Sequence, residues 1–390
     1  MNSFPEISQD VTDQIISWRH DLHRHPELGF EEKRTSAEVA RLLREFGLEV
    51  HEKVGTTGVV GVLKAGDGDR AIGLRADMDA LSITELNSFD HASRHPGRMH
   101  ACGHDGHTAM LLGAAKLLAN SRDFSGTVVF IFQPAEEHGR GALAMMEDGL
   151  FERFPVEAVY GIHNMPSLPT GQIALRRGPI MACEDNFEIG VLGKGVHAAM
   201  PHLSVDPILV ASEIVVALQS IVSRSLNPLE NGVISVTDFA VEATRNVIPE
   251  RVTLRGDTRS FLPAVQDQIE ASMARISDGI SAAYGATASF SYSREFASTI
   301  NTAREADIVA AVAREVVGED NVQPDCLPLM ASEDFGFMLQ RKPGCYLFLG
   351  NGGDGPGGCG LHSPHYDFND DILQTGVAFW LRLVRSQLSR

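Results

Sequence analysis

The sequence predicts an α/β protein in which a larger domain with a helix-flanked mixed sheet carries an inserted, ferredoxin-like α+β domain. Three observations lead to this prediction. Apolar strands alternate with helical segments in the first third of the chain, which is typical of a sheet covered by helices. The middle of the chain follows the order β-α-β-β-α-β instead. A chain of 390 residues, 43% of them hydrophobic, is long and apolar enough for two cores.

The first third predicts a sheet with helices on both faces. Apolar residues recur at helical spacing over residues 31–46, and Gly47 follows as a helix stop. The run GTVVFIF at residues 126–132 is continuously apolar, as in strands buried on both faces. The expected elements are a helix over 31–46, strands over 59–63 and 71–75, a helix over 107–118, and strands over 126–132 and 158–162.

The inserted domain is expected over residues 184–297. Its strands cover 187–193, 232–239, 251–261 and 286–296, and its helices cover 206–222 and 265–284. This order matches a split βαβ arrangement that is complete in about a hundred residues and folds as one unit. A helix over 302–317, a strand over 345–350 and a helix from 370 then resume the larger domain, which is expected over 1–183 and 298–390.

The composition of the chain limits the classes of binding partner and the cellular compartment that we expect. A net charge of -18 argues against a nucleic-acid partner, because phosphate binding needs clustered basic residues. The first residues lack the basic start and apolar core of an export signal, and no stretch approaches the roughly 20 apolar residues of a membrane span. Five scattered cysteines fit a reducing compartment. We therefore expect a cytoplasmic protein with a small-molecule partner, no nucleic acid and no membrane.

A first cluster of candidate metal ligands is the segment MHACGHDGHTA. Thiolate, imidazole and carboxylate all bind divalent metals such as Zn²⁺, and the Cys-x-His spacing lets two of them converge. The alternative is a polar capped loop whose histidines are incidental. The potential ligands are His100, Cys102, His104, Asp105 and His107.

Two adjacent carboxylates, Glu136 and Glu137, follow the buried strand 126–132 in the segment QPAEE. Such a pair suits a division of labour in which one carboxylate binds metal and the other takes a proton from water. The alternative is a solvated acidic turn, because charged pairs usually lie on the surface.

Two histidines complete a set of ligands. His163 follows another strand in GIHN, and His362 lies far downstream in GLHSPHYD. Together with Cys102, His104 and Glu137 they supply five protein ligands of the right types for a dinuclear centre that leaves positions for water and substrate.

Ordered motifs from about residue 19 to 370 resemble the metal-dependent amidohydrolase family of hippurate hydrolases, indoleacetyl-amino-acid hydrolases and related aminoacylases. The resemblance implies a catalytic two-metal domain, an inserted lid or dimerisation domain, and a homodimer or homotetramer. The motifs are RHDLHRHPELGFEE, LRADMDAL, MHACGHDGHTAMLLGAA, FQPAEE, GIHN, GKGVHAAMPH, NVIPE, ASEDF and LHSPHYDFND.

The resemblance also implies roles for individual residues. Glu136 is similar to the family's general base, and Asp79 lies where wider relatives place an acid that orients a metal ligand. Without the resemblance, Asp79 would be read as an acid that caps a strand end. The implied metal ligands are Cys102 as a bridge, His104, Glu137, His163 and His362.

In the inserted domain, His197 of GKGVHAAMPH is similar to the lid histidine that stabilises the oxyanion, in some relatives at the partner subunit's active site. Asn246 and Arg259 are candidates for binding a substrate carboxylate, although a strand arginine can simply pair with a nearby acid. The chain departs from many relatives at Val196, where they have glycine, and at Ser82, where proline is common.

The expected function is hydrolysis of the amide bond of N-acyl amino acids, with hippurate-like, acetyl or indoleacetyl groups as candidates. Glu136 would take the proton from a water activated by two divalent ions, Zn²⁺ or Mn²⁺. The alternatives are a metal-dependent dipeptidase or carboxypeptidase, a non-catalytic small-molecule binding protein and an acidic interaction protein with structural zinc. Cys102 as a nucleophile is a further alternative, but it would need a separate base and oxyanion site.

Overall fold

The computed structural model describes residues 7–354 and 357–389, which form two compact units. The first unit holds the described residues up to 180, residues 300–327 and those from 334 onward; the second holds Met181–Thr299 and Pro328–Glu333. These boundaries differ by at most three residues from the expected ones. Residues 328–333 are the exception, because we expected them in the larger domain. That segment groups with the second unit because the Ala182 N–H donates to the carbonyls of Leu329 and Ala331. The part of the expected larger domain at 1–6, 355–356 and 390 lies outside the described residues.

The first unit is built on a mixed eight-stranded sheet, as expected. The four central strands, β4, β3, β5 and β16, are parallel to one another. The antiparallel pairs are β1 with β2, β2 with β4, and β6 with β16. In spatial order the strands are β1 (Glu49–Val54), β2 (Gly58–Ala65), β4 (Gly126–Gln133), β3 (Ala71–Asp77), β5 (Ala158–Pro166), β16 (Gly344–Gly352), β6 (Ile173–Ala174) and β15 (Val322–Gln323).

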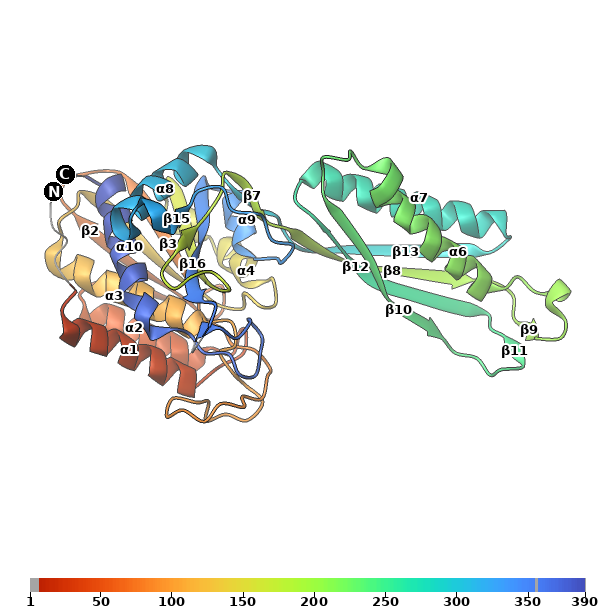
Figure 1. Cartoon of the computed structure of the whole chain (residues 1–390), viewed down its shortest axis with the longest axis horizontal. Coiled ribbons are helices and arrows are strands. Elements are labelled where there is room, and N and C mark those ends of the chain that lie inside the picture. The colour runs from red at the N-terminus through yellow and green to blue at the C-terminus, as the bar shows by residue number, and fades with distance from the viewer. Residues whose placement is uncertain (1–6, 355–356, 390) are drawn as a thin grey trace. The chain divides into compact units, whose positions relative to one another are not determined.

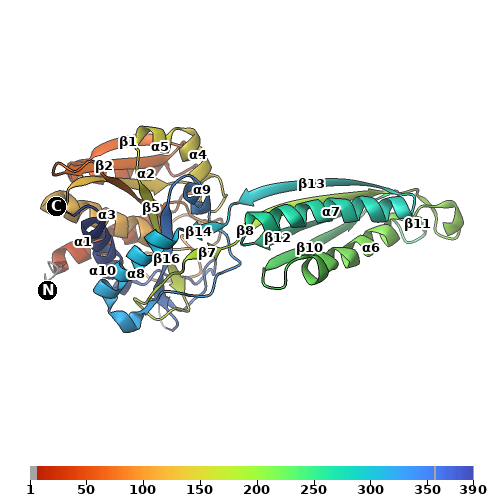
Figure 2. The ribbon, with the colours of Figure 1, turned by 90° about the horizontal axis from the view of Figure 1, so that it is seen from above.

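Helices cover both faces of this sheet (Figures 1 and 2). One face carries α1 (Gln9–Arg24), α2 (Lys33–Glu45), α3 (His104–Ser121), α8 (Ala303–Val317) and α10 (Leu373–Gln387); the other carries α4 (Gly141–Glu147), α5 (Leu150–Arg153) and α9 (Phe335–Leu339). Short 3-10 turns lie at Glu319–Asn321 and Asp370–Ile372, the second of which leads into α10. Both ends of the described chain belong to this unit (Figure 1).

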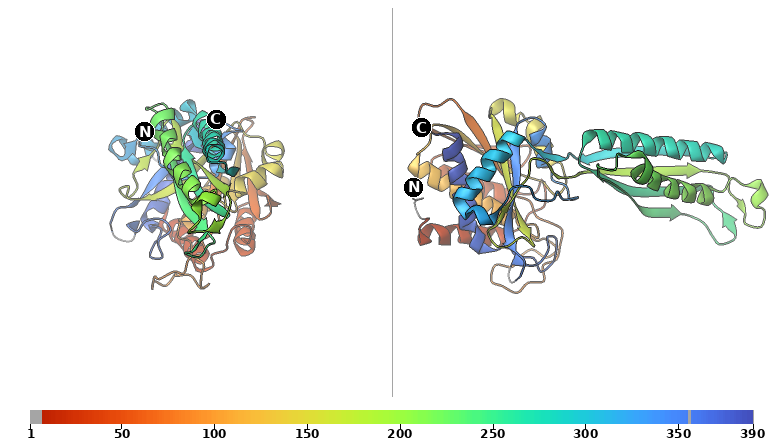
Figure 3. Two further views of the ribbon diagram at one scale, coloured as in Figure 1. Left: turned by 90° about the vertical axis from the view of Figure 1, so that its right-hand side faces the viewer. Right: turned by 45° about the horizontal axis from the view of Figure 1, so that its top comes forward.

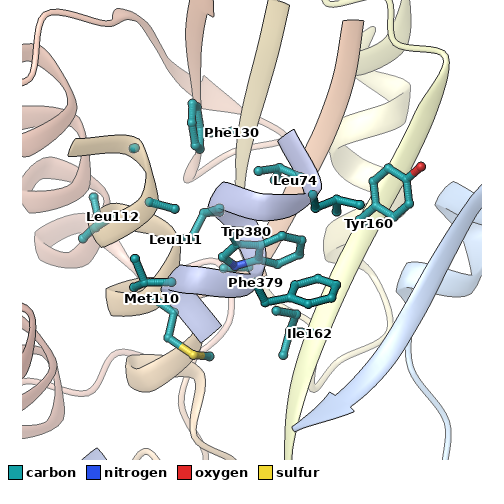
Figure 4. Close-up of a cluster of buried hydrophobic side chains, with 14 of the residues drawn as sticks. Leu74, Met110, Leu111, Leu112, Phe130, Tyr160, Ile162, Phe379 and Trp380 are labelled. Carbon is teal, nitrogen blue, oxygen red and sulfur yellow. The ribbon is translucent and has the colours of Figure 1, made fainter. Parts of the chain in front are cut away.

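Helix α3 is enclosed on nearly all sides, which explains its apolar sequence. It packs against α1, α10 and the sheet, and Gly113 lets Ile15 and Val377 approach closely, because an added Cβ would lie within 3 Å of both side chains. Figure 4 shows side chains of α3, α10 and strands β3, β4 and β5 meeting in this core, among them Met110 and Trp380. Each fully buried Leu or Phe contributes roughly 1.5–3 kcal/mol, so this core anchors the strands that carry the candidate centre.

The second unit confirms the ferredoxin-like arrangement. Its four antiparallel strands have the spatial order β10-β12-β8-β13, and α6 and α7 lie side by side on one face of the sheet (Figures 1 and 3). In chain order the elements are β8 (Cys183–Leu192), α6 (Pro207–Ser220), β10 (Gly232–Val241), β12 (Arg251–Ser260), α7 (Pro263–Ala283) and β13 (Thr287–Phe296).

Four short strands complete the fold. In the second unit, β9 (Val196–His197) pairs with β11 (Val247–Ile248), near a 3-10 turn at Pro201–Leu203. Strands β7 (Gly178–Met181) and β14 (Thr299–Asn301) pair where the chain passes from one unit to the other.

One helical stretch corrects the expectation about apolar segments. Residues Pro207–Ser225, comprising α6 and a π turn at Ile221–Ser225, are long and apolar enough to span a membrane by length and composition. Ile214 and Leu218 are buried in the core of the second unit, while Val216 and other apolar side chains of the same stretch are exposed. The stretch is therefore a core helix with a second, uncovered apolar side.

Candidate metal centre

The parallel strands of the first unit bring the candidate residues to one edge of the sheet. Asp77 ends β3, Glu136 and Glu137 follow β4, and His163 lies near the end of β5. Because β3 runs parallel to both β4 and β5, their carboxyl ends meet at the same edge. Cys102 lies two residues before His104, which is the first residue of α3.

Five side chains form two groups that share one sulfur atom. The ligand atoms of Cys102, His104 and His163 lie within 4.8 Å of one another, and so do those of Cys102, Glu137 and His362. The Cys102 Sγ is 3.4 Å from His163 Nε2, and His362 Nε2 is 3.5 Å from Glu137 Oε1. The structure therefore gathers all five residues that the sequence indicated as ligands, with Cys102 common to both groups.

Hydrogen bonds orient the histidines for binding a cation. His163 Nδ1 lies 2.6 Å from the carbonyl oxygen of Asn164 and donates to it, which leaves the lone pair of Nε2 directed toward Cys102. His104 Nδ1 faces the Asp79 carboxylate at 3.3 Å, and its Nε2 lies 3.9 Å from both Glu136 and Glu137. Both rings thus present Nε2 to the centre.

The donor set fits a divalent metal. His104 Nε2 and Glu137 Oε1 are buried and have no hydrogen-bond partner among the described residues, which is costly unless a cation binds there. Burial and the carboxylates of Glu137 and Glu136 raise the pKa of the Cys102 thiol well above its usual range. Burial opposes protonation of His104, but Asp77 and Asp79 raise its pKa to about 10. A bound cation would favour the thiolate and the neutral imidazole that metals require.

Glu136 and Glu137 do not form a solvated turn, since Glu136 is only 6% exposed. Asp79 fixes this pair: its two carboxylate oxygens accept the backbone N–H groups of Glu136 at 3.0 Å and of Glu137 at 3.1 Å. The same carboxylate faces His104, so Asp79 both caps the turn and contacts a candidate ligand. Ala135 precedes the pair in the left-handed region at φ 49°, where non-glycine residues are strained.

His107, a potential ligand by sequence, is used differently. Its Nδ1 donates to Asp77 at 2.6 Å, and its Nε2 accepts the backbone N–H of Asn164 at 2.9 Å, so neither nitrogen is free for a metal. Arg75 donates to the other oxygen of Asp77 at 2.7 Å. Asn164 also donates to the Cys102 carbonyl at 2.6 Å. Asp77 and Asn164 were not predicted as functional residues, although both lie in the motifs LRADMDAL and GIHN.

A buried ionic cluster lies behind the start of α3. His23 of α1 is 2.9 Å from Asp105 and 3.2 Å from Glu85, and Arg19 of the same helix is 3.5 Å from Asp105. Burial would raise the pKa of Asp105, but His23 and Arg19 hold it well below its usual range. Asp105 is therefore a partner of α1 rather than a member of the two ligand groups.

This cluster makes stability depend on pH. Burial opposes protonation of His23, yet Asp105 and Glu85 raise its pKa from 6.5 to about 9. A group whose pKa is raised on folding stabilises the folded protein fully at pH values below its unfolded pKa. For His23 this stabilisation is lost as the pH rises through about 9. The 2.5-unit difference between about 9 and 6.5 corresponds to about 3 kcal/mol. We expect His23→Gln to lower the unfolding temperature at pH 6.5 and to converge with wild type at pH 10, measured by thermal unfolding.

The matched control is His25→Gln, which alters a partly exposed histidine at the end of the same helix. It should follow the pH dependence of the wild type. Equal pH slopes for wild type and His23→Gln would show that the His23 ion pairs contribute no pH-dependent stability.

Two of the predicted residues in the second unit lie next to each other. His197 is exposed on β9, opposite Val247 of β11, and the Asn246 carbonyl accepts the Ala198 N–H at 2.9 Å. The Ala199 N–H donates to His197 Nδ1 at 3.1 Å, so neutral His197 carries its proton on Nε2 and can donate it. The Asn246 side chain accepts from the Thr244 hydroxyl at 3.0 Å.

Arg259 is not close to this pair. It lies eight residues beyond Arg251 on β12, about 26 Å along the strand at about 3.3 Å per residue. Its guanidinium contacts Asp257 at 2.7 Å and Glu184 at 2.9 Å, as in the alternative that it pairs with nearby acids. The binding of a substrate carboxylate by Arg259 stays a prediction. Such binding would require Arg259 to exchange Asp257 and Glu184 for the substrate.

Comparisons with known proteins agree with this geometry. Residues 73–386 match the family model of peptidase family M20/M25/M40. The chain is 42% identical to the hippurate hydrolase of Campylobacter jejuni over 388 residues, which is 100% of both proteins. It is 39% identical over 343 residues to the N-acetyl-L-cysteine deacetylase of Bacillus subtilis, covering 87% of this chain and 81% of that protein.

A solved structure from Bacillus subtilis, described as a dinuclear metal binding peptidase from the M20 family, has a TM-score of 0.86 and 32% identity. The match covers 98% of this chain and 99% of that one. The match therefore spans both units.

Proposed function

Because the chain belongs to peptidase family M20/M25/M40 and is a metal-dependent amidohydrolase, we propose that it hydrolyses N-acyl amino acids at a dinuclear centre with Glu136 as general base. One observation carries the proposal. Two ligand groups share the Cys102 sulfur, and the buried Glu136 carboxylate lies beside them, close enough to His104 and Glu137 to form a further candidate group. Because each of the two Cys102 groups already has three protein ligands, as catalytic metal sites commonly do, we assign Glu136 to proton transfer.

Each residue has one task in the proposed reaction. Two divalent ions at the centre would supply the positive charge that polarises the amide carbonyl and acidifies a water. Glu136 takes a proton from that water and later gives it to the leaving amine. Asp79 keeps Glu136 in place through the backbone of the turn. His197 donates from Nε2 to the oxyanion, and Asn246 binds the substrate carboxylate, from the same chain or from a partner.

The test is amine release from acetyl, benzoyl and indoleacetyl amino acids by protein stripped of metal and reloaded with Zn²⁺ or Mn²⁺. Two ions per chain and metal-dependent turnover of at least one acyl amino acid are the expected results, and the panel ranks the acyl groups. Turnover of dipeptides alone would favour the peptidase alternative. Binding of two ions without turnover of any amide would contradict the proposal and favour a binding protein.

We further propose that a second copy of the chain covers the apolar side of α6. Strand β10 is an edge of its sheet, and edge strands pair readily with a copy across a two-fold axis. The neighbouring exposed apolar side chains are Ile208, Leu209, Val216 and Val222. A homotetramer would need a further surface. All five cysteines are free thiols, which supports a reducing, cytoplasmic location.

We expect Val216→Asp to convert the dimer to a monomer, because Val216 is 70% exposed in the single chain and a buried carboxylate in an interface is costly. Sedimentation velocity at micromolar concentration measures the change. Leu327→Asp, at an exposed leucine of the first unit, is the control that should remain dimeric. A wild-type monomer, or an unaffected Val216→Asp dimer, would rule out this interface.

A further inference from the structure

The candidate ligand His362 is held differently from its counterparts. Cys102 and His104 are buried at the start of α3, and His163 is buried in β5. The His362 side chain is 53% exposed, and its backbone adopts a left-handed conformation at φ 64° in a segment without regular secondary structure. Neither burial nor a helix or strand therefore fixes its position, and the contacts of the segment must do so.

The backbone of this segment is attached to its neighbours at a few points. The His362 N–H donates to the Ala101 carbonyl at 2.8 Å, next to the candidate bridging cysteine. The Leu86 N–H donates to the Pro364 carbonyl, and the Asn87 side chain donates to the Tyr366 carbonyl, both at 2.9 Å. The segment continues through Asp367 to Asp370. Asp370 begins the 3-10 turn that leads into α10.

Arg19 connects this end of the segment to α1 and α3. Its side chain is fully buried. Nη1 donates to Asp367 at 2.8 Å and also lies 3.5 Å from Asp105, and Nε donates to Asp370 at 2.9 Å. Nη2 is 3.2 Å from His91 Nε2. A planar guanidinium holds several partners in fixed directions, which a lysine cannot do.

We propose that Arg19 is a positioning residue that sets the place of His362, and through it the affinity of the ion held by Cys102, Glu137 and His362. The inference rests on the proposed dinuclear centre. Arg19 contacts none of the five ligands of the proposed centre; it fixes Asp367 and Asp370 against α1. Between Asp367 and His362 the chain is also held by the buried Tyr366, whose hydroxyl donates to Asn164 at 2.7 Å, so Arg19 acts together with this contact.

The two ions should respond differently to loss of Arg19. Asp105, next to His104, keeps its contact with His23 at 2.9 Å, His104 keeps its contact with Asp79, and His163 keeps its hydrogen bond to the Asn164 carbonyl. The Asp367 carboxylate would keep only its contact with the partly buried His91 at 3.1 Å, although the Asp367 backbone carbonyl still accepts from Asn351. The ion at Cys102, His104 and His163 should therefore remain tightly bound, while the other weakens.

The experiment measures stepwise Zn²⁺ dissociation constants of the full chain by chelator competition, together with bound metal after dialysis. Arg19→Met should weaken the second ion by about 10- to 100-fold, as is common when a group that supports a ligand is removed, and leave the first within about twofold. Arg19→Lys should restore only part of the affinity. Arg70→Met, at a partly exposed arginine that pairs with Glu157, should match wild type.

A double mutant shows whether Arg19 acts through His362. His362→Ala should itself lose the second ion, and adding Arg19→Met should then leave the first ion unchanged. The inference is overturned if Arg19→Met keeps both affinities, weakens both ions equally, or weakens the remaining ion in the His362→Ala background. Failure of the wild type to bind two ions would instead contradict the proposed function.

Removal of a buried arginine leaves carboxylates unpaired and can prevent folding. Asp367→Asn tests the same link from the other partner, because it weakens the contact with Arg19 while keeping the side-chain shape. It should weaken the second ion selectively but less than Arg19→Met. Wild-type affinity for both ions in Asp367→Asn, if Arg19→Met does not fold, would overturn the inference.

Discussion

Glu136→Gln is expected to lower kcat by about 10²- to 10⁴-fold while the protein keeps its metal, because general-base catalysis typically contributes that much. The amide has nearly the same shape as the carboxylate but cannot take a proton from water. The position of the turn should persist, since the Glu136 N–H donates to Asp79 from the backbone. Single-turnover kinetics on the best acyl amino acid, beside metal analysis of the same sample, measure both effects.

The matched control is Glu147→Gln, an exposed position on α4 that should leave kcat unchanged. Loss of activity in Glu136→Gln together with loss of an ion would assign Glu136 to metal binding instead. Retention of more than a tenth of the wild-type kcat would exclude Glu136 as the base.

The candidate centre was largely predictable because its residues sit where strands end. The buried run of β4 and the apolar start of β5 both lead to candidate ligands, and parallel strands bring such ends together. Cys102 and His104 could be identified because the loop before α3 concentrates ligand-type side chains in a few residues. The sequence therefore indicated both the edge of the sheet and the set of candidate ligands that the structure brings together.

Other features could not be predicted, for physical reasons. Helix α1 was not expected, because its buried face includes Arg19 and His23, and these polar residues break the apolar periodicity that marks an amphipathic helix. Strand β1 was missed because it is a mostly exposed edge strand with the polar sequence EVHEKV. For α1, the partner that makes these polar residues suitable, Asp105, lies far away in sequence.

The division of labour among histidines was also beyond the sequence. His104 and His107 are three residues apart on one helix, yet His104 Nε2 faces the ligand groups while both nitrogens of His107 are bonded to Asp77 and Asn164. Only the packing of β3 and β5 against α3 decides between a ligand and a supporting residue. Sequence spacing alone is the same for either role.

Cys102→Ala is expected to remove both ions, whereas His163→Ala and His362→Ala should each remove one. The five predicted ligands form two groups, one of Cys102, His104 and His163 and one of Cys102, Glu137 and His362. Of these described side chains, Cys102 alone belongs to both groups. Loss of the several kcal/mol of charge stabilisation that metals supply corresponds to about 10³-fold in kcat. Metal content by mass spectrometry and the thiolate-to-cobalt absorption of Co²⁺-loaded protein measure the effect.

The outcome separates a shared thiolate from two independent sites. If Cys102→Ala keeps one tightly bound ion, the sulfur belongs to one group only, and the remaining group must be completed by another donor such as Glu136. The unfolding temperature of the metal-free variant should stay close to that of the metal-free wild type, because a small buried thiol is replaced by a methyl group. Loss of both ions with the metal-free fold intact would therefore assign Cys102 to the metals and not to the core.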